Sequence, residues 1–463
     1  MLFALALRAW LIPVNPADEG WFVQVVARVL HGEVLYRDVF YNTLPLPVWL
    51  TSLVSLPFGA QVLIVRGVAL IALLGQLWKI EQISRFLGGS GTFPYLAILT
   101  VIVYNSPFGD SPYSILANFF FLCCFERTLR WLDHKERWDL ILAAAFAGLA
   151  FCTKQNVGVL AFGALFVVSR RAIVLPVFAA IAGAALAPIA LSGAWSGFLN
   201  FTILNKGRYV SLVRSPFWTP LLESHTLGQV VGALPVLLLP AAALMLAYVF
   251  FRDTQARQRT WVVAVFCLAG MAVYYPFAEI GHMGYAVPAA CLAIVWCASR
   301  IGLPRAIHAA ALCGMLFLAV RGTLLPAIHI HEGMVAPTPF EHFRGSWMNQ
   351  DRIAQFASTS EALRTAPQPL LLLNAYAGFL YLTSGVPNRT PFDYPLVTTF
   401  GPHGEEQLAG RIERSEFQSA CIAPIAYLRL DPETLFSQVR SQMQPVQKLP
   451  ICELFAVPVK PGE

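Results

Sequence analysis

The chain of 463 residues is 57% hydrophobic and only 13% charged, and its mean hydropathy is +0.61. Soluble domains carry about a quarter of their residues as charged side chains. One soluble core does not absorb so much apolar surface, so the composition predicts a polytopic membrane protein. The net charge of +6 is too modest to indicate a nucleic-acid partner, and in a membrane protein it reflects basic cytoplasmic loops.

Hydropathy predicts a mainly α protein, a transmembrane helical bundle of about eleven spans. The spans lie near residues 2–14, 60–80, 93–104, 113–126, 138–152, 157–168, 173–192, 229–250, 260–275, 286–299 and 306–320. Several are shorter than the roughly 20 residues that a span needs, so we expect their helices to extend into the neighbouring loops. The first lacks the positive start and clear cleavage site of a signal peptide, and the alternation of the others requires it as a span.

The basic residues favour one orientation of these spans. They gather in four loops: Arg127, Arg130, Lys135 and Arg137; Arg170 and Arg171; Arg252, Arg257 and Arg259; Arg300 and Arg305. Alternation of the spans puts all four loops on the same side, which the positive-inside rule makes cytoplasmic. The outer side then receives the loop after the first span, segments 104–112, 152–158 and 274–285, and everything after about residue 322.

Scattered ionisable residues meet on that outer side. They are Asp18, Glu19, Asp110, Lys154, Glu279 and His282. Ionisable residues in membrane proteins tend to be functional because burying them is expensive. We therefore predict a reaction site at the outer boundary between membrane and water.

The two acids in "VNPADEGWFV" (14–23) precede an amphipathic segment, "WFVQVVARVLHG" (21–32). Its apolar residues recur at helical spacing, with Gln24, Arg28 and His31 on the other face. This predicts an interfacial helix that lies flat on the outer leaflet and ends at Gly32. Asp18 would be its N-cap, a role compatible with chemistry. A second interfacial segment with prolines is expected before the span near Ala60.

These features resemble the GT-C superfamily of membrane glycosyltransferases, and within it the family 39-like and aminoarabinose-transferase-like enzymes. The resemblance rests on the acid pair after the first span, the flat helix, "GEVLYRDVF" (32–40), "GLAFCTKQNVGVL" (148–160) and "HMGYAVPAA" (282–290). It covers most of the membrane region and implies a soluble C-terminal appendage. Asn42 departs from the pattern, since related sequences often carry a Lys there that would contact phosphate.

The resemblance implies transfer of a sugar from a polyprenyl-phosphate carrier, generally with inversion. Such a displacement needs a base for the acceptor hydroxyl and positive charge for the departing phosphate. By likeness Asp18 is the base, with Glu19 as the alternative. Candidates for binding the carrier phosphate or sugar are Lys154, Arg66, Arg37, His282, Glu279 and Asp110.

Four of these binding residues also have a structural interpretation. Asp110 sits in a Gly-Asp-Ser-Pro turn, and Lys154 fits a lysine that extends its ammonium to the bilayer surface. Arg37 is positioned for a surface pair with Asp38, and His282 for a structural hydrogen bond. No ligand set for a metal is evident, so no metal site is assigned, and a divalent cation stays possible without being required.

Composition changes after about residue 322, which divides the chain into a transmembrane region, 1–322, and a soluble domain, 323–463. Apolar runs at 369–374, 420–428 and 452–459 predict strands, and 404–415 and 431–443 predict helices, so a small α/β domain is expected. Cys421 and Cys452 start two of these strands, and an outer compartment would permit a disulfide. The aromatic and basic segment 193–228 is expected to be a lid or an interfacial strap.

Two other functions stay open on the sequence. A lipid or solute transporter or flippase would place charges at mid-membrane, and a non-catalytic envelope-assembly subunit would tolerate the loss of Asp18. The resemblance favours a multi-pass protein of a bacterial inner membrane, with its site on the periplasmic face. The expected partners are membrane lipids, a polyprenyl-phosphate-linked sugar and a glycan, lipid or protein acceptor. The sugar and the acceptor are not identified.

Overall fold

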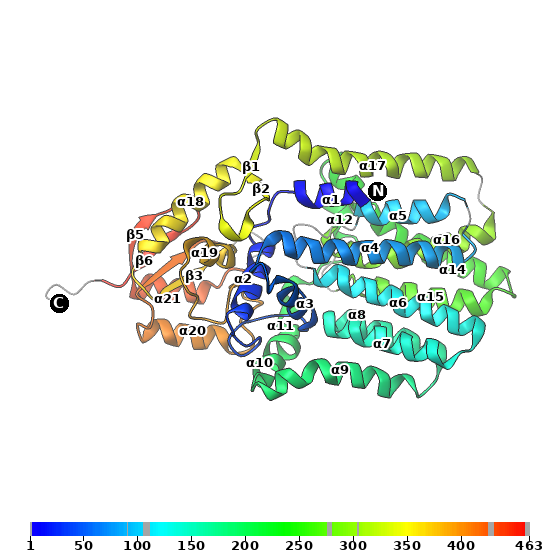
Figure 1. Cartoon of the computed structure of the whole chain (residues 1–463), viewed down its shortest axis with the longest axis horizontal. Helices are drawn as coiled ribbons and strands as arrows, with labels where there is room; N and C mark the ends of the chain where they lie inside the picture. Colours follow the sequence, from blue (N-terminus) through cyan, green and yellow to red (C-terminus); the bar gives the residue numbers. More distant parts are fainter. Residues whose placement is uncertain are drawn as a thin grey trace.

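The computed structural model describes residues 2–89, 91–104, 112–275, 280–302, 305–424 and 430–458. Each of the eleven predicted spans corresponds to a helix. These helices are α1 (Leu2–Leu11), α4 (Val62–Phe86), α5 (Phe93–Tyr104), α6 (Tyr113–His134), α7 (Arg137–Thr153), α8 (Gln155–Ser169), α9 (Val174–Leu191), α14 (Pro235–Arg252), α15 (Arg257–Ala272), α16 (Ile280–Ile301) and α17 (Arg305–His331). They pack side by side into one bundle (Figure 1).

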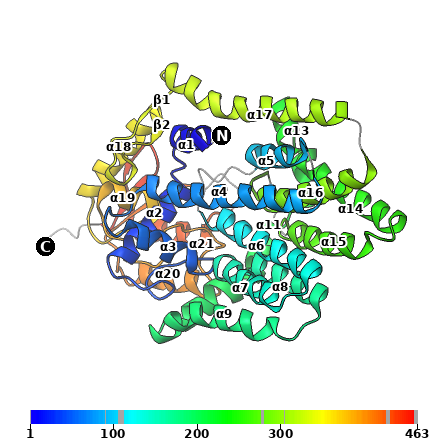
Figure 2. The same cartoon turned by 45° about the vertical axis from the view of Figure 1, so that its right-hand side comes forward.

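Length and apolar composition make this chain an integral membrane protein. Among the described residues, five helical stretches are long and apolar enough to cross a membrane: Val62–Phe86, Val174–Leu191, Leu227–Arg252, Gly284–Ile301 and Ala306–His331. The first helix, α1, has 10 residues and rises only about 15 Å, roughly half of a bilayer core. It lies against α4 and beside α17, which runs along one side of the bundle (Figure 2).

Ion pairs join the helices at one end of the bundle. Lys79 of α4 meets Glu126 of α6 at 2.6 Å, and Arg127 of α6 meets Asp139 of α7 at 3.1 Å. At this same end Arg259 of α15 pairs with Asp133 of α6. The four basic clusters therefore share one end, as the alternation of spans predicts.

Two short helices, α2 (Asp18–Leu30) and α3 (Leu46–Ser55), follow α1 at the opposite end. Helix α2 is buried on all sides, including Gln24 and Arg28 of the face that the sequence pattern gives to solvent. That face is covered because Arg28 pairs with Asp393 of the C-terminal domain at 2.9 Å. Gly32, with φ +90°, terminates the segment as expected.

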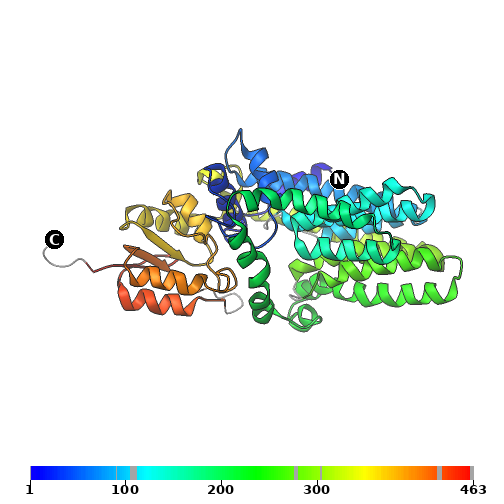
Figure 3. The same ribbon diagram turned by 90° about the horizontal axis from the view of Figure 1, so that it is seen from below.

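The segment after α9 is mainly helical. It contains α10 (Trp195–Phe198), a π-helix η1 (Leu199–Leu204), α11 (Asn205–Val213), α12 (Thr219–Leu222) and α13 (Leu227–Ala233). In Figure 3 its first part is a green column between the bundle and the C-terminal domain. The segment thus lies between these two parts of the molecule, and its role as a lid or a strap stays a prediction.

The C-terminal domain is a small α/β unit. Its elements are β1 (Val335–Pro337), η2 (Glu341–Phe343), β2 (Trp347–Asn349), α18 (Gln350–Thr365), β3 (Leu370–Leu373), α19 (Ala377–Ser384), α20 (Gly404–Glu413), β4 (Ser419–Ile422), α21 (Glu433–Gln442), β5 (Gln444–Lys448) and β6 (Glu453–Ala456). The main sheet has the order β3-β4-β6-β5, in which β3 and β4 are parallel and the other pairs antiparallel.

The expected strands and helices of this domain are present in the described residues. The three runs give β3, β4 and β6, and the two helical patterns give α20 and α21. A disulfide joins Cys421 in β4 to Cys452 next to β6, with 5.7 Å between their Cα atoms. Helix α17 continues to His331, so the boundary placed at 322 falls inside that helix.

Candidate functional site

Asp18 is the first residue of α2, and its carboxylate is held by the preceding turn. The Asn15 amide Nδ2 donates to Asp18 Oδ2 at 2.7 Å, while Asn15 Oδ1 accepts from the backbone N–H of Ala17 at 3.1 Å. The N-cap position is Ala17, so Asp18 is not the cap that the sequence predicts. The acid instead lies in the first turn, where it favours the positive end of the helix.

Glu19 occupies a different environment from its neighbour. Its side chain is 0% exposed and meets the Arg66 guanidinium twice, at 2.6 and 2.8 Å. Arg66 is 3% exposed and also donates to the backbone oxygens of Ala9 and Ile12 at 2.9 and 2.7 Å. Two adjacent acids, both candidates for the base, thus differ in burial. Glu19 and Arg66, a candidate phosphate ligand, neutralise each other inside the bundle.

Lys154 lies at the junction of α7 and α8, where the backbone is extended (φ −148°, ψ 113°). Its ammonium contacts the hydroxyl of Tyr285 and lies over the rings of Tyr113 and Tyr285, at 5.0 and 3.8 Å from their centroids. Ser114 also contacts the Tyr285 hydroxyl. The lysine therefore sits in an aromatic pocket that stabilises a cation.

His282 joins this cluster from α16. It precedes Tyr285 by three residues, and their ring centroids are 5.8 Å apart. The Asn118 side chain of α6 donates to the backbone oxygen of Gly284 at 3.0 Å and fixes the start of α16 against α6. The structure thus brings Lys154 and His282 to the same tyrosine. Asp110 and Glu279 lie outside the described residues.

Both clusters lie at the same end of the bundle. Helices α4 and α6 are parallel, because Gly75 faces Phe119 and Lys79 pairs with Glu126 further along. The starts of these helices, which carry Arg66 and Ser114, are therefore at one end. Figure 1 shows the start of α4 and helix α2 on the side of the bundle that faces the C-terminal domain. The basic ends of the helices lie opposite.

The C-terminal domain fixes α2 from its other side. Helix α19 crosses α2 at Gly20 and Gly378, where an added Cβ on Gly20 would come within 2.7 Å of Phe379 Cβ. Arg28 donates to Asp393 at 2.9 Å and to Glu33 at 2.5 Å. Burial raises the pKa of Asp393, although Arg28 opposes this by favouring the carboxylate. The C-terminal domain thus holds α2 near its start, at Gly20, and near its end, at Arg28.

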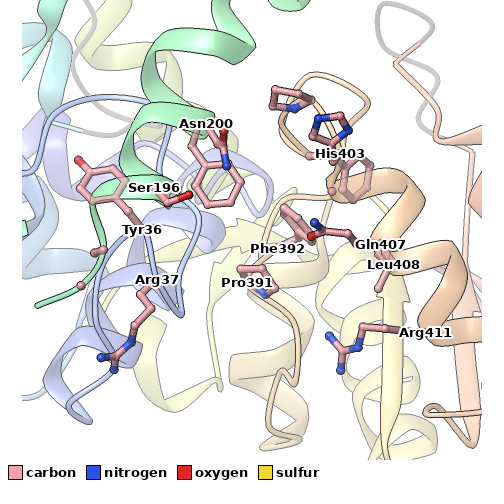
Figure 4. A pocket seen from close by; sticks show the side chains of 17 residues that line it. Tyr36, Arg37, Ser196, Asn200, Pro391, Phe392, His403, Gln407, Leu408 and Arg411 are labelled. Atoms are coloured by element: carbon pink, nitrogen blue, oxygen red, sulfur yellow. The ribbon is translucent and has the colours of Figure 1, made fainter.

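Arg37 lies away from these clusters in the loop between α2 and α3. It pairs with Asp38 at 2.8 Å, as the surface alternative predicts, and the Arg37 hydrogen bond lowers the pKa of the Asp38 carboxyl. Its side chain lines a cavity of about 350 Å³ between the loop, the start of the α10–η1 segment and the C-terminal domain (Figure 4). Within the described parts of the chain, no three His, Cys, Asp or Glu side chains are grouped to hold a metal.

Several residues of the Asp18 and Lys154 clusters are not predictable from the sequence. Asn15, Ser114 and Tyr113 carry no pattern of their own. Tyr285 had a signal, because it follows His282 by three residues in "HMGY" and so shares its helix face. The Glu19–Arg66 pair had none, since it depends on how α2 packs against α4.

The fold defines this chain as a polytopic membrane protein: a helical bundle with short helices after the first span and a docked α/β domain. The solved structures that share the fold include the crystal structure of ArnT from Cupriavidus metallidurans bound to undecaprenyl phosphate. It is 13% identical, with a TM-score of 0.61 over 99% of this chain and 98% of that one. ArnT from the same organism in the apo state is 14% identical, with a TM-score of 0.59 over 98% and 97%.

No family model and no curated protein matches this sequence. The likeness to ArnT therefore appears in the three-dimensional arrangement and extends over nearly the whole of both chains. At this level of identity the likeness establishes the fold. The fold is the one that the resemblance of the sequence motifs implies.

Proposed function

We propose that this chain is a membrane glycosyltransferase that transfers a sugar from a polyprenyl-phosphate carrier to an acceptor at the outer face of a bacterial inner membrane. The observation that carries the proposal is that this chain shares the fold of ArnT over nearly its full length. The crystal structure of that ArnT holds undecaprenyl phosphate. The gathering of Asp18, Lys154 and His282 at one end of the bundle supports it. Glycans, lipids and proteins all remain acceptor classes, and the proposal leaves the use of a divalent metal open.

The proposed reaction is a single displacement with inversion. The acceptor hydroxyl oxygen attacks the anomeric carbon, and Asp18 takes its proton. The bond from that carbon to the phosphate oxygen breaks, and the lipid phosphate leaves with the electron pair. Lys154 neutralises the departing phosphate, and His282 contacts the phosphate or orients the sugar. Asn15 holds one oxygen of Asp18 at 2.7 Å and thereby orients the carboxylate.

Glu19 and Arg66 are assigned a positioning role within this mechanism. Their twofold contact at 2.6 and 2.8 Å uses both oxygens of Glu19 and fixes the start of α2 on α4. Asp18 directly precedes Glu19 on that helix, so its position depends on the pair. Glu19 stays the alternative base, and Asp110 and Glu279 stay candidate ligands of carrier or acceptor.

The test is an assay of purified wild-type protein and Asp18→Asn against a panel of polyprenyl-phosphate sugars. We expect wild-type turnover with one donor and a loss of about 10²–10⁴-fold in the variant, the usual contribution of a general base. Glu81→Gln is the matched control, because Glu81 is exposed and pairs with Arg85 on α4 toward the basic end. Equal turnover by Asp18→Asn would remove Asp18 from the mechanism. Absence of turnover by folded wild type with every donor would favour a transporter or an assembly subunit.

A further inference from the structure

The cavity of about 350 Å³ beside Arg37 lies at the seam between the membrane region and the C-terminal domain. Figure 4 shows Ser196 and Asn200 on one side and His403 and Gln407 on the other, with Phe392 between them. Its volume falls within the range of about 300–1,000 Å³ that is usual for small-molecule sites. The two sides belong to elements about 200 residues apart in the sequence, so the domain arrangement creates the cavity.

Aromatic rings form the apolar wall of this cavity. The ring centroids of Phe201 and Phe392 are 6.1 Å apart, and those of Phe392 and Phe400 are 4.8 Å apart. The ring of Phe40 packs on that of Phe201, with 5.1 Å between their centroids. An added Cβ on Gly404 would come within 2.9 Å of Phe392 Cζ, so the start of α20 presses directly on the ring. The rings are therefore held rigidly. These rings meet edge to face, and apolar ring surfaces of this kind can pack against the C–H groups of a sugar ring.

Polar side chains on the rim are available for a ligand. Within the described residues, the side chains of Ser196, Asn200 and Gln407 form no hydrogen bond with the protein. A hydroxyl and two amides can each donate and accept, which matches an array of sugar hydroxyls. The guanidiniums on the rim are already neutralised, Arg37 by Asp38 and Arg411 by Glu416. The lining thus favours a hydroxyl-rich ligand over a bare phosphate.

The π-helix η1 connects this cavity to the Lys154 cluster. Asn200 and Phe201 of η1 line the cavity, and the backbone oxygen of Thr202 accepts a hydrogen bond from Gln155 at 3.2 Å. Gln155 directly follows Lys154 in the chain. Helices of the π type concentrate at functional sites. The same short helix would therefore contact a ligand in the cavity, and it contacts the residue next to Lys154, which is proposed to hold the carrier phosphate.

From the aromatic wall, the open polar rim and the link through η1, we propose that this cavity binds a saccharide unit of the acceptor. Binding of the saccharide is a property of the cavity alone, whereas its role as the acceptor rests on the proposed function. The two are tested separately, because binding is measured without turnover.

The experiment is saturation-transfer NMR on the full-length protein in detergent with methyl glucoside, methyl galactoside, methyl mannoside, N-acetylglucosamine, glucuronate and inorganic phosphate. We expect transfer to at least one saccharide and none to phosphate. Gln407→Ala and Asn200→Ala should each weaken binding about tenfold, the effect of one lost hydrogen bond. Ser196→Trp should abolish binding, because the indole would fill the cavity from an exposed position.

Matched controls separate the cavity from the rest of the domain. Gln442→Ala changes an exposed glutamine on α21, and Arg414→Gln changes the other arginine paired with Glu416, which does not line the cavity. Both should bind as wild type, and all variants should keep the wild-type melting temperature. Binding of phosphate but no saccharide, or saccharide binding that survives Ser196→Trp, would overturn the proposal. An inactive enzyme that still binds saccharide at this cavity would refute only the proposed function.

Discussion

Asp18 and Glu19 show how adjacent residues of one type receive separate tasks. Consecutive residues of a helix point about 100° apart, so two neighbouring carboxylates do not face the same surroundings. Glu19 is buried against Arg66, whereas Asp18 is partly exposed at the start of α2 beside Asn15. Of the two, Asp18 is the less buried acid and is the one that an incoming hydroxyl can reach from solvent.

The buried pair gives the first prediction. Glu19→Gln should lower the stability by about 3–5 kcal/mol, because it leaves the Arg66 charge buried without a counter-ion. The double variant Glu19→Gln, Arg66→Met removes both charges and should recover most of that loss. The measurement is the thermal unfolding of purified protein in one detergent. A Glu19→Gln protein with wild-type stability and no turnover would instead identify Glu19 as the base.

Lys154 carries the second prediction. Lys154→Met keeps most of the length of the side chain and removes its charge, so kcat/KM for the lipid-linked donor should fall about 10²–10³-fold. Tyr285→Phe keeps the ring and removes the contacting hydroxyl, so we expect a smaller loss of about tenfold.

Lys135→Met is the matched control for this prediction. Lys135 also lies over an aromatic ring, 4.6 Å from the centroid of Trp131, but at the opposite end of the bundle. Its variant should turn over as wild type in the same steady-state assay. Unchanged kinetics for Lys154→Met would show that this lysine only extends to the membrane surface.

The sequence predicts these residues unevenly for a physical reason. Asp18, Lys154 and His282 stand out because a charge is rare in an apolar chain, and span alternation alone puts them at one end. Which partner each side chain meets depends on helix rotation, which hydropathy does not specify. The sequence analysis gives Arg66 as a candidate for binding the carrier, but its contact with Glu19 depends on the packing of α2 on α4.

At the scale of elements, the crossing of α2 and α19 depends on two glycines. An added Cβ on Gly378 would lie 2.8 Å from the Cα atom of Trp21, a backbone atom that cannot move aside alone. This close approach lets α19 press on the helix that carries Asp18. The C-terminal domain is therefore part of the support of the candidate site.

A substitution at this crossing gives the third prediction. Gly378→Ala should lower the melting temperature, with a destabilisation of about 1–3 kcal/mol, and should reduce turnover because α2 is displaced. Gly163→Ala is the matched control in α8, where an added Cβ has no neighbour within 4 Å and helix propensity favours alanine. Thermal unfolding and donor turnover are measured on both variants. Wild-type values for Gly378→Ala would mean that the crossing tolerates a wider separation.

The long apolar helices were predictable because each carries enough hydrophobic residues to be recognised alone. The short helices α10 to α12 were missed, because four to nine residues give no clear periodicity. Strand β5, "QPVQK", was also missed, since all five of its residues are exposed and it forms only by pairing with β6. An element that is stabilised mainly by pairing with another part of the chain cannot be predicted from its own residue pattern.

At the scale of the whole molecule, charge divides the protein into two ends. One end holds the basic clusters and their ion pairs, Lys79–Glu126 and Arg259–Asp133 among them. The other holds the Asp18 and Lys154 clusters below the C-terminal domain. The positive-inside rule then assigns the basic end to the cytoplasm and leaves the candidate site outside. In the proposed reaction, both the acceptor and the lipid-linked sugar would bind at that face.

This orientation is the fourth prediction, and thiol labelling in intact cells tests it. Single cysteines replace Glu223 in the α12–α13 loop, Gln442 in the C-terminal domain and Glu136 between α6 and α7, all in a Cys313→Ser background because Cys313 is exposed. A membrane-impermeant maleimide should label positions 223 and 442 in intact cells. Position 136 should react only after the cells are broken.

The labelling pattern decides more than the topology. A carrier phosphate at Lys154 and an acceptor proton at Asp18 belong to one reaction only if both open to the same compartment. Labelling of 136 together with 223 from outside would break the alternation of spans on which the shared site depends. The reverse pattern, with only 136 labelled in intact cells, would place the whole site in the cytoplasm. An acceptor at the outer face could not then be the substrate, whatever the chemistry of Asp18.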